Sequence, residues 1–170
     1  MQDDSASLLA CLPRLRRYAR ALLGDRAGAD DLVQDTMERG WHKLSTWRRG
    51  GDMRAWLFSI MHNLHVDQQR QPKLPTEALS DELHGSLSTP GTSGSDRLEV
   101  RDMQAALQML PAEQREVLLL VALEEMSYEE VAAILNIPPG TVMSRLSRAR
   151  ERLRLLMLGQ SPVSTLKVVK

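Results

Sequence analysis

The sequence has a single cysteine, few aromatic residues and no long apolar run. Cys11 alone cannot form an internal disulfide or a metal site built from cysteines. The longest apolar run, from Val117 to Leu123, has seven residues and is too short to span a membrane. The first 17 residues begin acidic and become basic only after their apolar positions, the reverse of a secretory signal. We therefore expect a cytoplasmic protein without membrane insertion.

Net charge is also lacking, but the charges are unevenly distributed. The 170 residues include 22 basic and 22 acidic side chains. Residues 100–140 carry a net charge of −5, whereas residues 141–170 carry +6. A clustered basic segment, rather than the net charge, is the footprint of nucleic-acid binding. A solvated helix face is the alternative explanation of such a segment.

The segment 71–97 divides the chain into two parts. It is rich in serine and threonine and contains Pro72, Pro75 and Pro90, a composition typical of linkers. Apolar residues elsewhere recur at helical spacing. We therefore predict an all-α protein with two small helical domains, residues 1–70 and 98–158. Residues 71–97 form a flexible linker between them, and residues 159–170 form a C-terminal tail.

Three helices are expected in the first domain. One face of the first helix is formed by Leu8, Leu12, Leu15, Ala19 and Leu22, and Gly24 ends it. Asp30 is the expected N-cap of the second helix. The third runs from about Met53 to Gln69, with Trp56 on its apolar stripe.

Four helices are expected in the second domain. The first two are Leu98 to Met109 and Pro111 to Glu124, since proline suits a first helical turn. The third is short, with Ser127 as its N-cap and Glu130 completing a capping box.

A short helix, a turn and a basic helix follow one another between Ser127 and Leu153. This is the spacing of a helix-turn-helix, in which the second helix enters the major groove of DNA. Thr141 is expected to cap that helix, which runs to about Leu158. An ordinary helical hairpin is the alternative, but only Glu151 opposes five arginines here. The residues expected to contact DNA are Thr141, Met143, Ser144, Arg145, Ser147, Arg148 and Arg152.

Three segments resemble a known family. SYEEVAAILNIPPGTVMSRLSRARERL is similar to region 4 of the extracytoplasmic-function (group 4) sigma factors of bacterial RNA polymerase. ARALLGDRAGADDLVQDTMERGW resembles the start of their region 2, and RAWLFSIMHNLHVDQQR its end. The resemblance covers about residues 8–70 and 98–156, in the family's order, and is closest to general-stress members. It implies an alternative sigma factor, not an enzyme, that binds core polymerase, directs promoter-specific initiation and is held inactive by an anti-sigma factor, without a cofactor.

The resemblance also assigns roles to residues of the first domain. By this resemblance, one surface matches the family's docking face for the β′ clamp helices of core polymerase. Its residues are Asp31, Gln34, Asp35 and Glu38. The loop 45–52 and the third helix match the part of the family that captures the melted −10 strand. The residues expected to contact that strand are Trp47, Arg48, Arg49 and Asn63. Trp47 is alternatively a buried anchor of its loop, and Trp56 is expected in the core.

One residue departs from the family pattern. Met143 stands where many members place a basic residue near the start of the recognition helix. Methionine cannot donate to guanine, so readout of the −35 element is expected to shift to Ser144, Ser147 and Arg148, or to DNA shape.

Two other functions remain as alternatives. A sigma-like decoy would bind an anti-sigma protein without initiating transcription, but the arginine-rich last helix argues against it. A metalloenzyme would use His62, His65 and Asp67, but the sequence shows no second ligand pair and we expect no metal.

Overall fold

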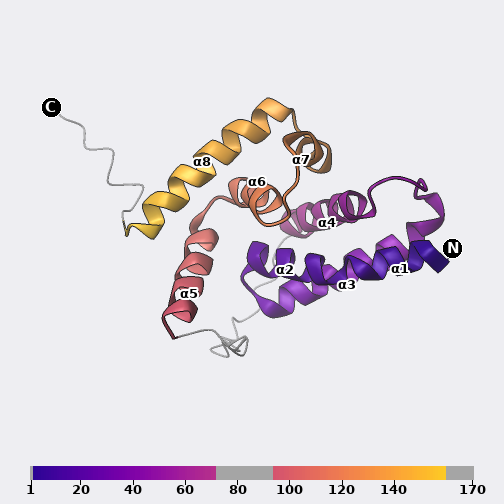
Figure 1. Ribbon diagram of the computed structural model, residues 1–170, viewed down its shortest axis with the longest axis horizontal. Helices are drawn as coiled ribbons and strands as arrows, with labels where there is room; N and C mark the ends of the chain where they lie inside the picture. The colour runs from indigo at the N-terminus through magenta and orange to yellow at the C-terminus, as the bar shows by residue number, and fades with distance from the viewer. Residues whose placement is uncertain (1, 72–93, 160–170) are drawn as a thin grey trace.

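A computed structural model describes residues 2–71 and 94–159, and all regular structure within these ranges is helical (Figure 1). The first unit contains α1 (Gln2–Ala10), α2 (Leu12–Leu23), α3 (Arg26–Lys43), the 3₁₀ turn η1 (Leu44–Thr46) and α4 (Met53–Arg70). The second contains α5 (Gly94–Met109), α6 (Ala112–Ala122), α7 (Tyr128–Leu135) and α8 (Pro139–Met157). The all-α fold class is confirmed.

The first expected helix is divided in two at Cys11. Pro13 lies in the first turn of α2, where its missing N–H and fixed φ suit a new helix start. Gly24 ends α2 as expected, because its φ of 67° is left-handed and costs glycine little. The Asp30 prediction was wrong, since the side chain of Asp25 accepts hydrogen bonds from the backbone of Ala27 and Gly28 and caps α3.

Large apolar side chains hold the first unit together. Tyr18 of α2 and Phe58 of α4 are buried edge to face, with ring centroids 4.9 Å apart. Gly40 of α3 lets that helix approach α4 closely, because a Cβ there would lie 2.8 Å from a methyl carbon of Leu57. The apolar faces of α2, α3 and α4 therefore meet in one core.

The second unit starts earlier than expected, since α5 begins at Gly94 and not Leu98. The capping box of Ser127 and Glu130 is confirmed, with both reciprocal hydrogen bonds present. Thr141 is not a cap: α8 begins at Pro139, whose fixed φ suits a first helical turn, and Thr141 is its third residue. The expected tail is described only at Gly159, and the linker only at Gln71 and Gly94–Arg97. Their other residues lie outside the described ranges.

α7 and α8 form the expected helix-turn-helix. Asn136 ends α7 with a left-handed φ of 55°, which turns the chain towards α8. Val131 and Leu135 of α7 are buried with Val142, Leu146 and Ala149 of α8. This packing leaves the opposite side of α8 uncovered (Figure 1).

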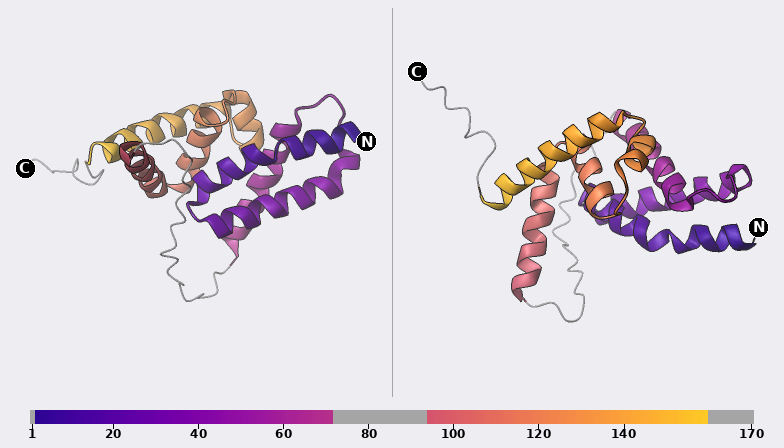
Figure 2. Two further views of the ribbon diagram at one scale, coloured as in Figure 1. Left: turned by 60° about the horizontal axis from the view of Figure 1, so that its bottom comes forward. Right: turned by 45° about the horizontal axis from the view of Figure 1, so that its top comes forward.

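The two units lie against each other. α2 packs on α5 and α6, and α4 packs on α7 (Figure 2). Helical periodicity does not indicate this contact, which determines which surfaces of the two units are free.

Candidate functional site

The outer face of α8 is the first candidate surface. Because Val142, Leu146 and Ala149 are buried, the residues that lie between them on the helix point outwards. Met143, Ser144, Ser147 and Arg148 are all exposed, and they occupy the first turns of the helix. Met143 is half exposed, at 50%, so an apolar group stands on this polar surface. Helix N-terminal turns of this kind fit the major groove.

Three of the expected DNA-contact residues lie at the edge of this face. Thr141, Arg145 and Arg152 are half-buried. Nη2 of Arg145 lies 3.7 Å from a carboxylate oxygen of Glu113 on α6, so its charge is partly neutralised. The helix thus brings Ser144, Ser147 and Arg148 together and sets Arg145 to one side.

Further along α8, Arg154 forms a two-bond ion pair with Glu151 at 2.8 and 3.2 Å. This pair lowers the pKa of the Glu151 carboxyl and raises that of Arg154, chiefly through the side-chain hydrogen bond. Both side chains are more than half exposed, so the pair is easily exchanged for contacts with phosphate. Arg150, which is not among the seven residues expected to contact DNA, lines a shallow groove with Tyr128 of α7 and Met143.

The acidic face of α3 is the second candidate surface. Asp31, Gln34, Asp35 and Glu38 are all exposed and lie within two turns on one side of the helix. None of the three carboxylates makes an ion pair with any other residue in the described ranges. They are free to meet a basic partner.

A groove lined by apolar side chains and by polar ones, including three arginines, adjoins the acidic face, and the sequence analysis missed it. Trp41 of α3 and Leu9 of α1 are 53% and 56% exposed, which is unusual for such large apolar side chains. They line the groove together with Gln34, Met37 and Glu38. Helical spacing could have indicated this, because Trp41 lies seven residues after Gln34 and three after Glu38, on the same face of α3. The candidate docking face is therefore apolar as well as acidic.

The residues expected at the −10 element lie at two places. Trp47 is half-buried and packs against Trp56, with ring centroids 6.4 Å apart. It is thus an anchored aromatic with part of its surface free. Arg48 and Arg49 are exposed beside it, and Nε of Arg49 lies 3.5 Å from Asp4 of α1. Asn63 is exposed on α4, roughly 15 Å along the helix axis from its first residue.

The two histidines of α4 face the second unit. Nδ1 of His62 lies 2.9 Å from a carboxylate oxygen of Glu116 on α6. His65 is buried, and burial lowers the pKa of its imidazole. Within residues 2–71 and 94–159, no three His, Cys, Asp or Glu side chains are grouped to hold a metal ion. Over the same ranges, no helix combines the length and apolar character that crossing a membrane demands.

Known protein families match both units. The family model described as "Sigma2 domain of PhyR" matches residues 8–62, and "Sigma-70, region 4" matches residues 101–153. The ECF RNA polymerase sigma factor EcfG of Rhodopseudomonas palustris is 38% identical over 92% of this chain and 84% of its own length. SigM of Bacillus subtilis, also an ECF RNA polymerase sigma factor, is 31% identical over 82% of this chain and 86% of its own.

Solved structures agree with the sequence relatives. The sigma factor RpoE of Bartonella quintana, in complex with the anti-sigma factor NepR, superposes with a TM-score of 0.73 at 34% identity, covering 93% of this chain and 98% of that one. CnrH, in complex with the cytosolic domain of CnrY, gives a TM-score of 0.69 at 30% identity over 95% and 92%. The chain therefore belongs to the extracytoplasmic-function family of RNA polymerase sigma factors.

Proposed function

We propose that this chain binds core RNA polymerase through α3 and directs it to promoters with a −35 and a −10 element. The outer face of α8 is the observation that carries the proposal. Arg148 and two serine hydroxyls stand exposed on the first turns of a helix-turn-helix, where base edges are read. The basic residues further along the helix suit phosphates.

Docking on polymerase follows from the free carboxylates of α3. Asp31, Asp35 and Glu38 face solvent, and none of them pairs with a cation from residues 2–71 or 94–159. A basic helical partner, such as the clamp helices of β′, would complement them, and Trp41 would add an apolar contact beside the charges. Charge would then orient the encounter, while the indole contributes contact area.

Capture of the −10 element is assigned to the loop after η1 and to α4. Trp47 keeps one part of its ring against Trp56, which fixes its position. The exposed guanidinium groups of Arg48 and Arg49 suit the backbone of a melted strand, and the Asn63 amide suits a base edge. The half-buried indole combines the two roles, anchor and base contact, that the sequence left open.

Regulation by an anti-sigma factor is part of the same proposal. RpoE is described in complex with NepR, and CnrH in complex with CnrY. A cytoplasmic inhibitor that grips both units of this chain would gain affinity from their linkage, because capture of one unit raises the local concentration of the other.

The decoy reading remains the second candidate, and one observation favours it. The family model that matches residues 8–62 is that of PhyR, and PhyR of Bartonella quintana is described as an anti-anti-sigma factor. That structure is only 20% identical and shows a shared fold alone.

Selection of DNA by the reconstituted complex separates the two candidates. The chain is mixed with purified core polymerase and a library of genomic fragments, and the retained fragments are sequenced. A sigma factor enriches fragments with two short common blocks at a fixed spacing. A decoy leaves the retained fragments the same as with core polymerase alone.

A further inference from the structure

The contact between the two units completes a helix end on each side. Two carbonyls in the last turn of α2, those of Ala21 and Leu22, accept hydrogen bonds from Gln108 at 3.1 Å and Arg115 at 2.9 Å in the second unit. Carbonyls at a helix C-terminus have no partner inside the helix, so these bonds satisfy groups that are otherwise left to water. The positive charge of Arg115 also complements the end of the helix dipole.

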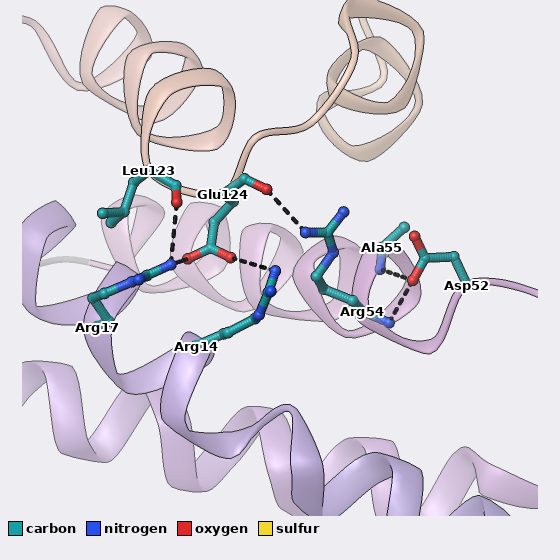
Figure 3. A network of polar contacts seen from close by, with 7 residues as sticks. All are labelled: Arg14, Arg17, Asp52, Arg54, Ala55, Leu123 and Glu124. Atoms are coloured by element: carbon teal, nitrogen blue, oxygen red, sulfur yellow. Dashed lines mark hydrogen bonds and ion pairs between the residues drawn. The ribbon is translucent and has the colours of Figure 1, made fainter.

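Carbonyls at the C-terminal end of α6 likewise accept hydrogen bonds from arginines of the first unit. The carbonyl of Leu123, the C-cap of α6, accepts from Arg17 of α2 at 3.1 Å. The next carbonyl, that of Glu124, accepts from Arg54 of α4 at 2.9 Å. Asp52 caps α4 through the backbone of Arg54 and Ala55, and so fixes the turn from which Arg54 extends (Figure 3).

A buried carboxylate lies at the centre of this contact. The Glu124 side chain has 0% exposure, and its Oε1 accepts from Arg17 Nη2 at 3.1 Å. Its Oε2 lies 3.8 Å from Arg14 Nη1 and has no hydrogen-bond partner among the residues that the structure describes (Figure 3). Both cations belong to the other unit, and no cation from residues 94–159 pairs with Glu124. A carboxylate removed from water is costly unless paired, so the closed contact itself makes this burial tolerable.

The chain cannot bind a promoter in the proposed way while the two units are in contact. This inference therefore rests on the proposed function. α8 packs on α7, and α7 packs on α4. With helix axes about 8–10 Å apart, α8 lies within roughly 20 Å of α4. Elements centred at −35 and −10 are about 25 base pairs apart, or roughly 85 Å of duplex at about 3.4 Å per step. The two units must separate before both elements are bound.

We propose that Glu124, held by Arg14 and Arg17, is a latch that keeps the free chain closed. Separation of the units breaks the contacts of the carboxylate with both guanidinium groups, which are already half exposed, and it frees the four helix-end carbonyls. The chain thus restrains itself, because only its open fraction is competent for promoter binding and the apparent affinity falls in proportion. The His62–Glu116 pair links α4 to α6 at a second point of the same contact.

Distances between spin labels in the free chain test the latch. Cysteines replace Gln69 on α4 and Ala133 on α7, both exposed, in a Cys11→Ser background. The parent chain is expected to give one narrow distribution of short distances by pulsed electron resonance. Glu124→Arg places like charges together, so the narrow peak is lost and longer distances replace it. The triple exchange Arg14→Glu, Arg17→Glu and Glu124→Arg restores the narrow peak.

The matched control is Glu125→Arg, which makes the same charge change at an exposed neighbour in the same turn and leaves the peak unchanged. If Glu124→Arg lowers helix content by circular dichroism, the exposed pair Arg14→Ala and Arg17→Ala takes its place, with the same expected loss. A broad distribution in the parent chain, or a narrow peak that survives these variants, overturns the latch. Neither outcome involves polymerase or DNA, so the proposed function is tested separately.

Discussion

Arg145 of α8 and Glu113 of α6 form an ion pair, with 3.7 Å between Nη2 and Oε2. The pair draws Arg145 towards the second unit's own core, so it is less exposed than its neighbours. Arg148, one turn later, is exposed and pairs with no acidic side chain in the described ranges. Two arginines that are equivalent in the sequence are thus different in their availability to DNA.

Arg148→Ala is predicted to weaken binding of the full chain to its −35 duplex by about 1–3 kcal/mol, because a guanidinium that forks onto a guanine is lost. The measurement is fluorescence anisotropy against the selected duplex and against duplexes with each base pair changed. The base pair read by Arg148 is expected to lose its preference. Unaltered base preference would reject this assignment.

Two other arginines serve as comparisons. Arg152→Ala is predicted to weaken all duplexes alike and to reduce the dependence of log K on log salt by about one, as expected for a phosphate contact. Arg145→Ala is predicted to have the smallest effect of the three, since Glu113 already compensates its charge. If Arg145→Ala weakens DNA binding as much as Arg148→Ala does, the ion pair with Glu113 does not make Arg145 less available to DNA.

Reversal of charge on α3 is predicted to block association with core polymerase. Asp31→Arg combined with Asp35→Arg brings like charges to the docking face, at a cost of several kcal/mol. Both residues are exposed, so the fold is retained and DNA binding by α8 persists. Glu99→Arg, an exposed charge reversal on α5, is the control. Normal association of the double variant, measured by labelled-chain titration, would rule out the acidic face.

Trp41→Ala is predicted to weaken association with polymerase by about tenfold, or ~1.4 kcal/mol, through loss of apolar contact area. Because Trp41 is exposed, thermal stability should hardly change. Met109→Ala removes another exposed apolar side chain, from α5, and should leave the affinity as it is. If both variants bind polymerase like the parent chain, the groove beside α3 is not part of the docking face.

The stability of the closed chain is predicted to fall as the pH drops below 6.5. Burial lowers the pKa of His65 beneath its value of 6.5 in the unfolded chain. The unfolded chain therefore takes up a proton first, and stability that is complete above pH 6.5 is lost as the pH falls towards the folded pKa. Urea unfolding at pH 7.5 and 5.5 measures the loss, which His65→Leu should reduce. If the free energy of unfolding of His65→Leu depends on pH as strongly as that of the parent chain, His65 is not the cause of the loss.

Local signals in the sequence predicted most of the helices. Ser127 and Glu130 make the capping box because a cap depends on residues three apart, and Gly24 ends α2 for an equally local reason. The errors at Asp30 and Thr141 arose because each helix was expected to start just before its first apolar residue. In the structure α3 starts after the N-cap Asp25, and α8 starts at Pro139.

The contact between the units could not be predicted in this way. Arg17 and Glu124 are 107 residues apart, and neither lies in a periodic pattern that points to the other. Glu124 in the sequence is one of two adjacent acidic residues, and only packing decides that it is buried while Glu125 is exposed. The exposed residues of α3 and α8, by contrast, follow from helical spacing once the buried stripe is known.

Run-off transcription with purified core polymerase tests whether this chain initiates transcription as a sigma factor. A DNA fragment carrying both selected blocks is transcribed with and without the chain, and a fragment with altered spacing between the blocks is run in parallel. A transcript of defined length is expected only when the chain is present and the spacing is intact. Absence of any chain-dependent transcript, from a chain that still binds core polymerase, would contradict it.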